Sequence, residues 1–175
     1  MTYKELQSLF WEMTAQIVEA YVTDVHQFVR QSYPTEGQPD WRITDNIVFV
    51  NLAERADPYG QQYDSEYRTE EDTVRRYRAR TRVWDVSFTA YGPDSYEMLN
   101  AIRDDVLTEP IHRFLSQHGV FLITDVPACR QVPELWAGKW WDRWDLILHF
   151  NEWHELPPED VGRIDTVTLG GSASR

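Results

Sequence analysis

Four arginines stand at every second position in one segment of the chain: Arg76, Arg78, Arg80 and Arg82. Side chains alternate between the two faces of a β-strand, so a strand here would place all four guanidinium groups on one face. Guanidinium groups bind carboxylates through paired hydrogen bonds. Two interpretations stay open: the row is a solvated strand face, or it binds acidic residues of a neighbouring copy of the chain.

The same spacing continues beyond the arginines with apolar side chains. Trp84, Val86, Phe88 and Ala90 have the parity of Arg82 and would share its face of the strand. We therefore predict one long strand over residues 76–91. Its apolar half is anchored in the core, and its charged half projects into solvent or toward a partner. Such a projection suits an assembly subunit better than an enzyme.

Tryptophan is concentrated near the carboxyl end of the chain, where five of the eight tryptophans are found: Trp136, Trp140, Trp141, Trp144 and Trp153. Three roles remain open for this group, namely core packing, a subunit interface and stacking of a ligand. Trp is enriched at protein–protein hot spots, so Trp140 and Trp141 join the arginine row as candidate interface residues. Stacking of single-stranded nucleic acid would also require a positively charged groove.

Patterns that bind phosphates or activate nucleophiles are missing from the sequence, since GxxxxGK[ST], GxGxxG, HExxH and GxSxG do not occur. His149 and His154 stand five residues apart, and His112 and His118 stand six apart. Neither spacing directs two imidazoles to one metal ion on a helix or a strand. The single cysteine, Cys129, has no internal disulfide partner. We expect no cofactor, no metal site and no enzymatic activity.

Two aspartates in the tryptophan-rich segment are the best remaining candidates for acid–base chemistry. Asp142 or Asp145 in an aromatic pocket would have a raised pKa. The competing interpretation is a strand edge at which these carboxylates pair with Arg143. A small-ligand site or enzyme is therefore the weakest of the functional hypotheses.

The chain is strongly acidic, with 29 Asp and Glu against 17 Lys and Arg in 175 residues and a net charge of −12. This charge disfavours binding to phosphate backbones, and it makes like subunits repel unless opposite charges are locally matched. An acidic surface either meets a basic partner or avoids holding nearby DNA. Apolar runs are too short to cross a bilayer, and the first residues lack a signal-peptide pattern, so we expect no membrane partner and synthesis in a cytoplasm.

The hydrophobic periodicity predicts the order of the elements. The spacing of residues 3–31 predicts one long or bent helix, residues 34–40 predict a loop, and the β-branched run 47–52 predicts a strand. Residues 53–73 are polar and end in acidic residues, which would pair with the arginine row across a hairpin. Two helices are expected after Gly92-Pro93, with Gly119 ending the second in a left-handed conformation.

Further strands are expected over residues 120–125, from Trp140 to Asn151, and over residues 164–169 in the tail. This order lacks regular βαβ alternation. It predicts an α+β fold: a mostly antiparallel sheet with helices packed on one face, a long N-terminal helix, and an extended β-hairpin or loop arm. We expect one domain over residues 1–155, with the arm at about 53–82, and a C-terminal tail over 156–175.

The order and spacing of these elements resemble a known family. The strand VWDVSFTAY (83–91), the helix over 94–107, a helix ending in LSQHGV (115–120), a proline-bearing loop and the return strand RWDLILHFN (143–151) carry the resemblance. Together with the leading helix and the loop QSYPTEGQPDW (31–41), the chain resembles the neck or tail terminator proteins of tailed bacteriophages, also called tail-completion proteins.

The resemblance implies a structural virion protein without catalytic residues. Members of this family form a hexameric ring that caps the tail tube and joins the tail to the neck. The implied partners are other copies of the chain, the tail tube, and neck or head-completion proteins. DNA would pass through the ring without specific binding. The implied location is the virion, after assembly in the host cytoplasm. The alternative is an acidic immunity- or inhibitor-type protein that binds a basic partner one to one.

Overall fold

The centre of the molecule is one mostly antiparallel sheet built around two long strands. In the computed structural model of the chain, which describes residues 1–70 and 73–161, the main strand order is β1-β2-β4-β9-β5. These strands are β1 (Val29–Gln31), β2 (Ile47–Arg55), β4 (Thr73–Tyr91), β9 (Arg143–Glu155) and β5 (Val120–Leu122). Neighbours run antiparallel except β1 and β2, which are parallel. The sheet is therefore mostly antiparallel, as predicted.

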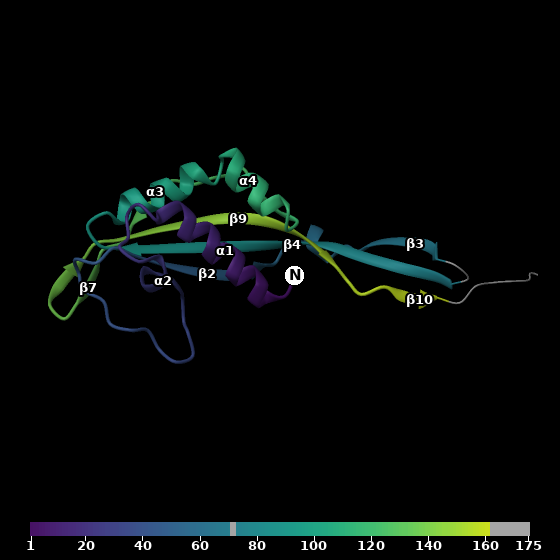
Figure 1. The fold of residues 1–175 in the computed structure, drawn as a ribbon, viewed down its shortest axis with the longest axis horizontal. Helices are drawn as coiled ribbons and strands as arrows, with labels where there is room; N and C mark the ends of the chain where they lie inside the picture. Colours follow the sequence, from purple (N-terminus) through teal and green to yellow (C-terminus); the bar gives the residue numbers. More distant parts are fainter. Residues whose placement is uncertain (71–72, 162–175) are drawn as a thin grey trace, which may run out of the picture.

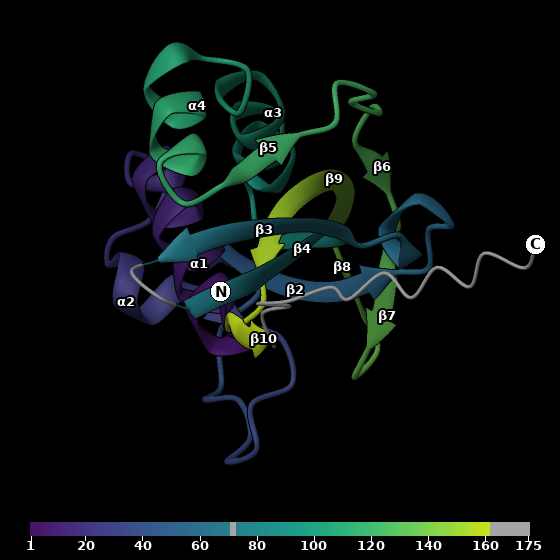
Figure 2. The ribbon, with the colours of Figure 1, turned by 90° about the vertical axis from the view of Figure 1, so that its right-hand side faces the viewer.

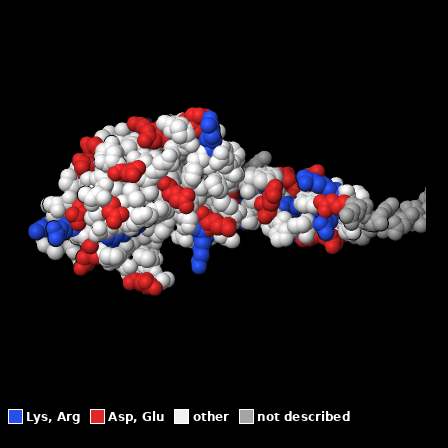
Figure 3. Space-filling model, viewed as in Figure 1, with Lys and Arg blue, Asp and Glu red and all other residues white. Residues whose placement is uncertain are grey.

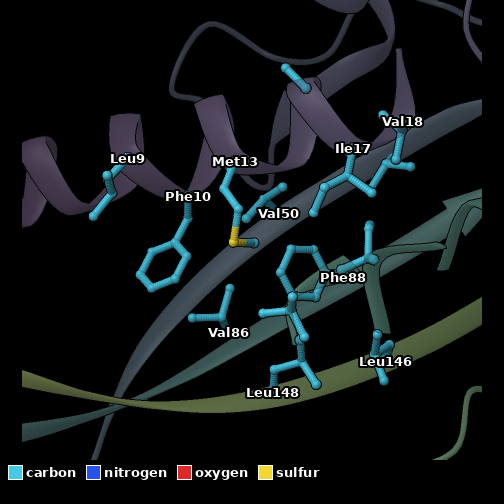
Figure 4. Close-up of a cluster of buried hydrophobic side chains, with 14 of the residues drawn as sticks. Leu9, Phe10, Met13, Ile17, Val18, Val50, Val86, Phe88, Leu146 and Leu148 are labelled. Atoms are coloured by element: carbon cyan, nitrogen blue, oxygen red, sulfur yellow. The ribbon is translucent and has the colours of Figure 1, made fainter. Parts of the chain in front are cut away.

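Helices cover one face of this sheet (Figure 1). They are α1 (Tyr3–Val18), α3 (Ser95–Asp105) and α4 (Glu109–Ser116). Their apolar faces meet the side chains that β2, β4 and β9 direct to the same side, as Figure 4 shows for Phe10 and Met13 above Val86 and Leu148. The apolar half of the predicted long strand, Trp84 to Ala90, lies in this core at alternate positions. The α+β class with helices on one face is confirmed.

A long N-terminal helix is present, as predicted, but it ends earlier than the sequence pattern indicated. A capping box formed by Thr2 and Glu5 starts α1, but the helix ends at Val18. Asp24 then caps a separate short helix, α2 (Val25–Phe28), and the chain enters β1. The helical spacing of residues 25–31 was misleading, because these apolar residues serve a short helix and a strand that pairs with β2.

An arm projects from the body along its long axis (Figure 1), and Figure 2 views the molecule from the end of the arm. It consists of the first half of β4 flanked by β3 (Asp64–Glu70) on one side and β10 (Glu159–Val161) on the other. The acidic and basic segments thus form a hairpin, as expected from the sequence. β3 pairs with β4 as far as Ala79, and β2 takes over from Val83, while β9 pairs with β4 without a break from Ala79 to Tyr91.

The gap between β3 and β2 along the edge of β4 is covered by a short 3-10 turn, η1 (Tyr59–Gln61). Gly60 approaches the backbone so closely that a Cβ there would lie 2.8 Å from the carbonyl oxygen of Thr81. The turn expected around residues 57–60 therefore packs against β4 where arm and body meet.

The strand predicted to start at Trp140 is divided in two. β8 (Lys139–Trp141) pairs with β7 (Glu134–Trp136) in a separate hairpin, and β9 starts at Arg143. A short strand β6 (Arg130–Gln131) also pairs with β9. Gly119 has the expected left-handed conformation, with φ at 69°. The strand predicted over residues 164–169 lies outside the described residues.

Candidate assembly surfaces

The arginine row lies on the helix-side face of β4, as the parity predicted, and its last member, Arg82, is mostly covered by the body. Arg82 is opposite Glu152 in the register of β4 and β9. Its Nε donates to Oε2 at 2.9 Å and its terminal nitrogen donates to Oε1 at 2.8 Å. The Glu152 side chain has no exposed surface, and that of Arg82 is 12 % exposed. Arg82 is thus used inside the subunit.

Glu152 receives further donors because it lies at the edge of the core. The indole Nε1 of Trp84 donates to it at 2.7 Å, and the amino group of Met1 at 3.0 Å. Burial by itself raises the pKa of Glu152, but the hydrogen bonds from Arg82, the amino terminus and Trp84 outweigh burial and lower it. The carboxylate is therefore charged and fully hydrogen-bonded.

The other three arginines of the row are about one third exposed, and each lies near a carboxylate of its own chain. Arg76 and Arg78 both pair with Glu159 on β10, and Arg80 lies 3.6 Å from Glu54 on β2. The opposite face of the arm is paired in the same way, because Arg75 contacts both Glu70 and Asp160. Figure 3 shows the resulting mixture of acidic and basic groups on the arm.

The arm has no core of its own. Every residue of β3 is exposed, and no residue of β4 from Thr73 to Arg78 is buried. Large side chains such as Tyr67, which is 61 % exposed, contribute to this surface. Two- and three-stranded sheets without an apolar layer are marginally stable in water, so burial against another surface would stabilise the arm.

The five tryptophans of the carboxyl-terminal segment do not form one cluster. Trp144 faces the helices and packs on Tyr96 of α3. Trp153 is on β9, on the side of the sheet away from Trp144, and is 44 % exposed. The remaining three belong to the β7–β8 hairpin.

The β7–β8 hairpin presents large apolar side chains to solvent. Trp136 and Trp140 are each 67 % exposed, and Leu135, directly opposite Trp140, is 57 % exposed. Ala137 and Gly138 form the tip, both with positive φ. Two such residues match the twist of a tight hairpin. Figure 1 shows β7 at the end of the body opposite the arm.

The other face of this hairpin is held to the body by aromatic contacts. Trp141 packs edge-on against Trp41 and Tyr91, with ring centroids 6.1 and 6.4 Å apart. The hydroxyl of Tyr91 donates to Glu134 of β7 at 2.8 Å. Burial and this hydrogen bond raise the pKa of Tyr91 to about 12. Arg143 lies over the Tyr91 ring and 3.6 Å from Glu134.

A pocket of about 560 Å³ opens between this hairpin and the body. Four of its lining residues are aromatic and two are acidic: Trp41, Tyr91, Trp136, Trp141, Asp40 and Glu134. Among the described residues, none forms a hydrogen bond or ion pair with the Asp40 carboxylate. The pocket therefore combines ring faces with negative charge.

The two aspartates proposed for acid–base chemistry lie outside this pocket. Asp142 accepts a hydrogen bond from Gln131, and Asp145 forms a two-point ion pair with Arg143. The pairing with Arg143 is the alternative that the sequence offered. Within the described part of the chain, no group of three or more side chains is arranged to hold a metal ion.

Several residues of these surfaces could not be predicted from the local sequence pattern. Trp41, Tyr91 and Glu134 meet only through the tertiary fold. A signal for the hairpin did exist, because Ala137-Gly138 separates two short segments of apolar and aromatic residues. The buried carboxylate was harder to find, since Glu152 differs from other glutamates only in the alternation of β9.

The chain thus combines a helix-covered, mostly antiparallel sheet with a projecting, charge-paired arm and an exposed aromatic hairpin. The chain belongs to the phage neck terminator protein family, whose model matches residues 4–172. The resemblance drawn from the sequence is thereby confirmed, and with it a structural role in the virion at the head–tail junction. A search of curated proteins found no match. No helix in the described residues is long and apolar enough to cross a membrane.

Proposed function

We propose that this protein closes into a hexameric ring that caps the tail tube of a bacteriophage and joins it to the neck, with no enzymatic step. The observation that carries the proposal is the arm. This chain belongs to a family of the head–tail junction, and its 19-residue strand β4 extends well beyond the core of the subunit. Such an extension gains stability when it is buried against another subunit.

Ring closure requires that one surface of a subunit meets a different surface of the next. The arm and the β7–β8 hairpin lie at opposite ends of the molecule (Figure 1) and supply two such surfaces. In this arrangement Arg76, Arg78 and Arg80 lie in one surface and Trp140 in the other. Arg82 and Trp141 support these surfaces from inside the subunit, through Glu152 and Trp41.

The acidic charge suits a channel for DNA. A net charge of −12 per subunit would repel the phosphate backbone, so that DNA passes through the ring without binding to its wall. The protein would reach the virion after assembly in the host cytoplasm.

The decisive experiment is the mass of the assembled particle. Native mass spectrometry and negative-stain microscopy of the purified protein are expected to give a closed hexameric ring. A monomer both in solution and in virions would exclude the ring. A one-to-one complex with a single basic protein would instead favour an inhibitor-type function.

Paired charge reversals test the role of the arginine row. Arg78→Glu removes the internal pair with Glu159, and adding Glu159→Arg restores a pair of opposite orientation. If Arg78 also contacts the neighbouring subunit, the double variant will fold but will assemble poorly. Full assembly of the double variant would show that the pair acts only within the arm.

A further inference from the structure

We propose that the pocket under the β7–β8 hairpin is a binding site for an arginine or lysine side chain of another protein at the head–tail junction. The junction partner rests on the function proposed above, whereas the cation site rests on the pocket itself. The pocket has a volume of about 560 Å³, which is ample for a basic side chain and the backbone around it.

The chemistry of the lining favours a cation. The faces of Trp and Tyr rings attract guanidinium and ammonium groups within about 6 Å. Two of the lining rings already have a guanidinium group at this distance, since Arg30 lies 5.9 Å from the Trp41 ring centroid and Arg143 lies 6.0 Å from that of Tyr91. Neither of these arginines lines the pocket.

The carboxylates at the pocket add charge to this preference. Arg143, 3.6 Å away, partly compensates the charge of Glu134, whereas Asp40 forms no ion pair with any of the described residues. The net charge of −12 on the whole chain adds a long-range attraction for basic partners. An incoming cation would therefore find aromatic faces, one unpaired carboxylate and a favourable field.

The arm of a second copy is a poor occupant. Its arginines are already paired with carboxylates of their own chain, as Arg75 is with Glu70 and Asp160, and Arg78 with Glu159. Entry into the pocket would require breaking such a pair. A basic segment of a different protein carries no such penalty.

The exposed Trp136 identifies where the occupant enters. It lines the pocket and yet is 67 % exposed, so its ring is accessible from solvent. Trp residues of this kind dominate binding energy once a partner covers them. Trp136 thus serves as the outer wall, and Trp41, Tyr91 and Trp141 as the inner walls.

The probe for this site is the peptide acetyl-Gly-Arg-Gly-amide, compared with the same peptide containing citrulline, which has the shape of arginine without its charge. The protein is labelled with ¹⁵N in the tryptophan indoles, and signals are assigned by single Trp→Phe variants. The arginine peptide is expected to shift the signals of Trp41, Trp136 and Trp141 saturably, with a dissociation constant of about 1 mM. The citrulline peptide is expected to leave them in place.

Two variants and one control locate the binding. Asp40→Asn and Trp136→Ala are each expected to weaken binding of the arginine peptide about three- to tenfold, because each removes one attraction for the cation. Trp153→Ala removes a partly exposed Trp outside the pocket and is expected to change nothing. Asp40 is exposed, so its variant should fold normally.

Equal shifts with both peptides, or unchanged binding in both pocket variants, would overturn the proposal. A loss of self-association in Asp40→Asn, whose residue lies outside the hairpin, would also overturn it, because the occupant would then be a second copy. The peptide titration does not depend on ring formation. A protein that binds the arginine peptide but stays monomeric would refute the ring and leave the cation site standing.

Discussion

Arg82 and Glu152 face each other across β4 and β9 in a two-point ion pair, with the carboxylate wholly removed from solvent. The pair lies beside the short segment of β4 between Ala79, where pairing with β3 ends, and Val83, where pairing with β2 begins. It therefore fastens the strand where the arm leaves the body. Breaking one half of a buried ion pair is costly, because the other charge is left buried without a partner.

Replacing Glu152 by glutamine is expected to destabilise the protein strongly. The amide keeps the shape of the carboxylate but leaves Arg82 without a counter-charge in a buried place. We expect a loss of about 3 kcal/mol in the free energy of unfolding, measured by urea denaturation. Glu159→Gln, which removes the half-exposed partner of Arg78, is the matched control, with an expected loss of at most about 1 kcal/mol. Similar losses in both variants would contradict the special role of Glu152.

Acid should remove the difference between wild type and Glu152→Gln. The pKa of Glu152 is lower in the folded protein than in the unfolded chain, where it is about 4.3. Its stabilising effect is therefore fully present above that value and is lost as the pH falls through the folded-state pKa. Urea titrations between neutral pH and strong acid should show the two stability curves converging. Parallel curves would mean that the carboxylate is not the source of the difference.

Gly92 is expected to tolerate no side chain, for two separable reasons. Its φ is 107°, and a Cβ would lie 2.4 Å from the backbone oxygen of Asp45. Gly37 has a similarly positive φ of 82° but nothing within 4 Å of its Cβ position. Gly37→Ala should cost about 1 kcal/mol from backbone strain alone. Gly92→Ala should cost at least about 3 kcal/mol, because strain and collision add. Equal melting temperatures for the two variants would show that the collision does not contribute to the loss of stability.

The phenol of Tyr91 should lose its proton at a higher pH than an ordinary tyrosine. Its pKa is raised to about 12 by burial and by the hydrogen bond to Glu134. The contribution of Tyr91 to stability is thus complete below its unfolded-state pKa of about 10 and is lost as the pH rises through about 12. The absorbance difference at the phenolate band between wild type and Tyr91→Phe should therefore develop near pH 12. A midpoint near 10 would show that the hairpin does not cover this residue.

Hydrogen exchange should divide β4 into two parts. In the isolated subunit the amides of β3 and β10 are expected to open with about 1 kcal/mol or less, since the arm has no apolar layer. Amides of β4 between β2 and β9 should be protected to nearly the full stability of the fold. Incorporation into a ring should then slow exchange in the arm. Strong protection of the arm in a proven monomer would contradict the idea that it needs a neighbour.

Local patterns predicted the elements whose burial repeats regularly. The alternation from Trp84 to Ala90, the stripe that places Met98 and Ile102 in α3, and the glycine at 119 needed no tertiary information. The acid-then-base order before β4 likewise predicted the hairpin. These elements are local, because each depends on neighbours a few residues away.

The remaining features depend on distant parts of the chain. Residues 25–31 have helical spacing, but Val29–Gln31 pair with the edge of β2 as a parallel strand. The pocket combines Asp40 and Trp41 from a loop with Tyr91 and the β7–β8 hairpin, and no sequence spacing links the three. The arginine row was correctly placed on one face, but its partners on β2, β9 and β10 emerged only from the register.

The continuity of β4 gives the molecule a mechanical character. One strand of 19 residues, about 60 Å when extended, belongs to the core at one end and to the arm at the other. A pull on the arm along this strand is resisted by the whole ladder with β9, whose hydrogen bonds run across the direction of the pull and are loaded together. A force on the arm is therefore transmitted along β4 directly to the strands that lie beneath the helices.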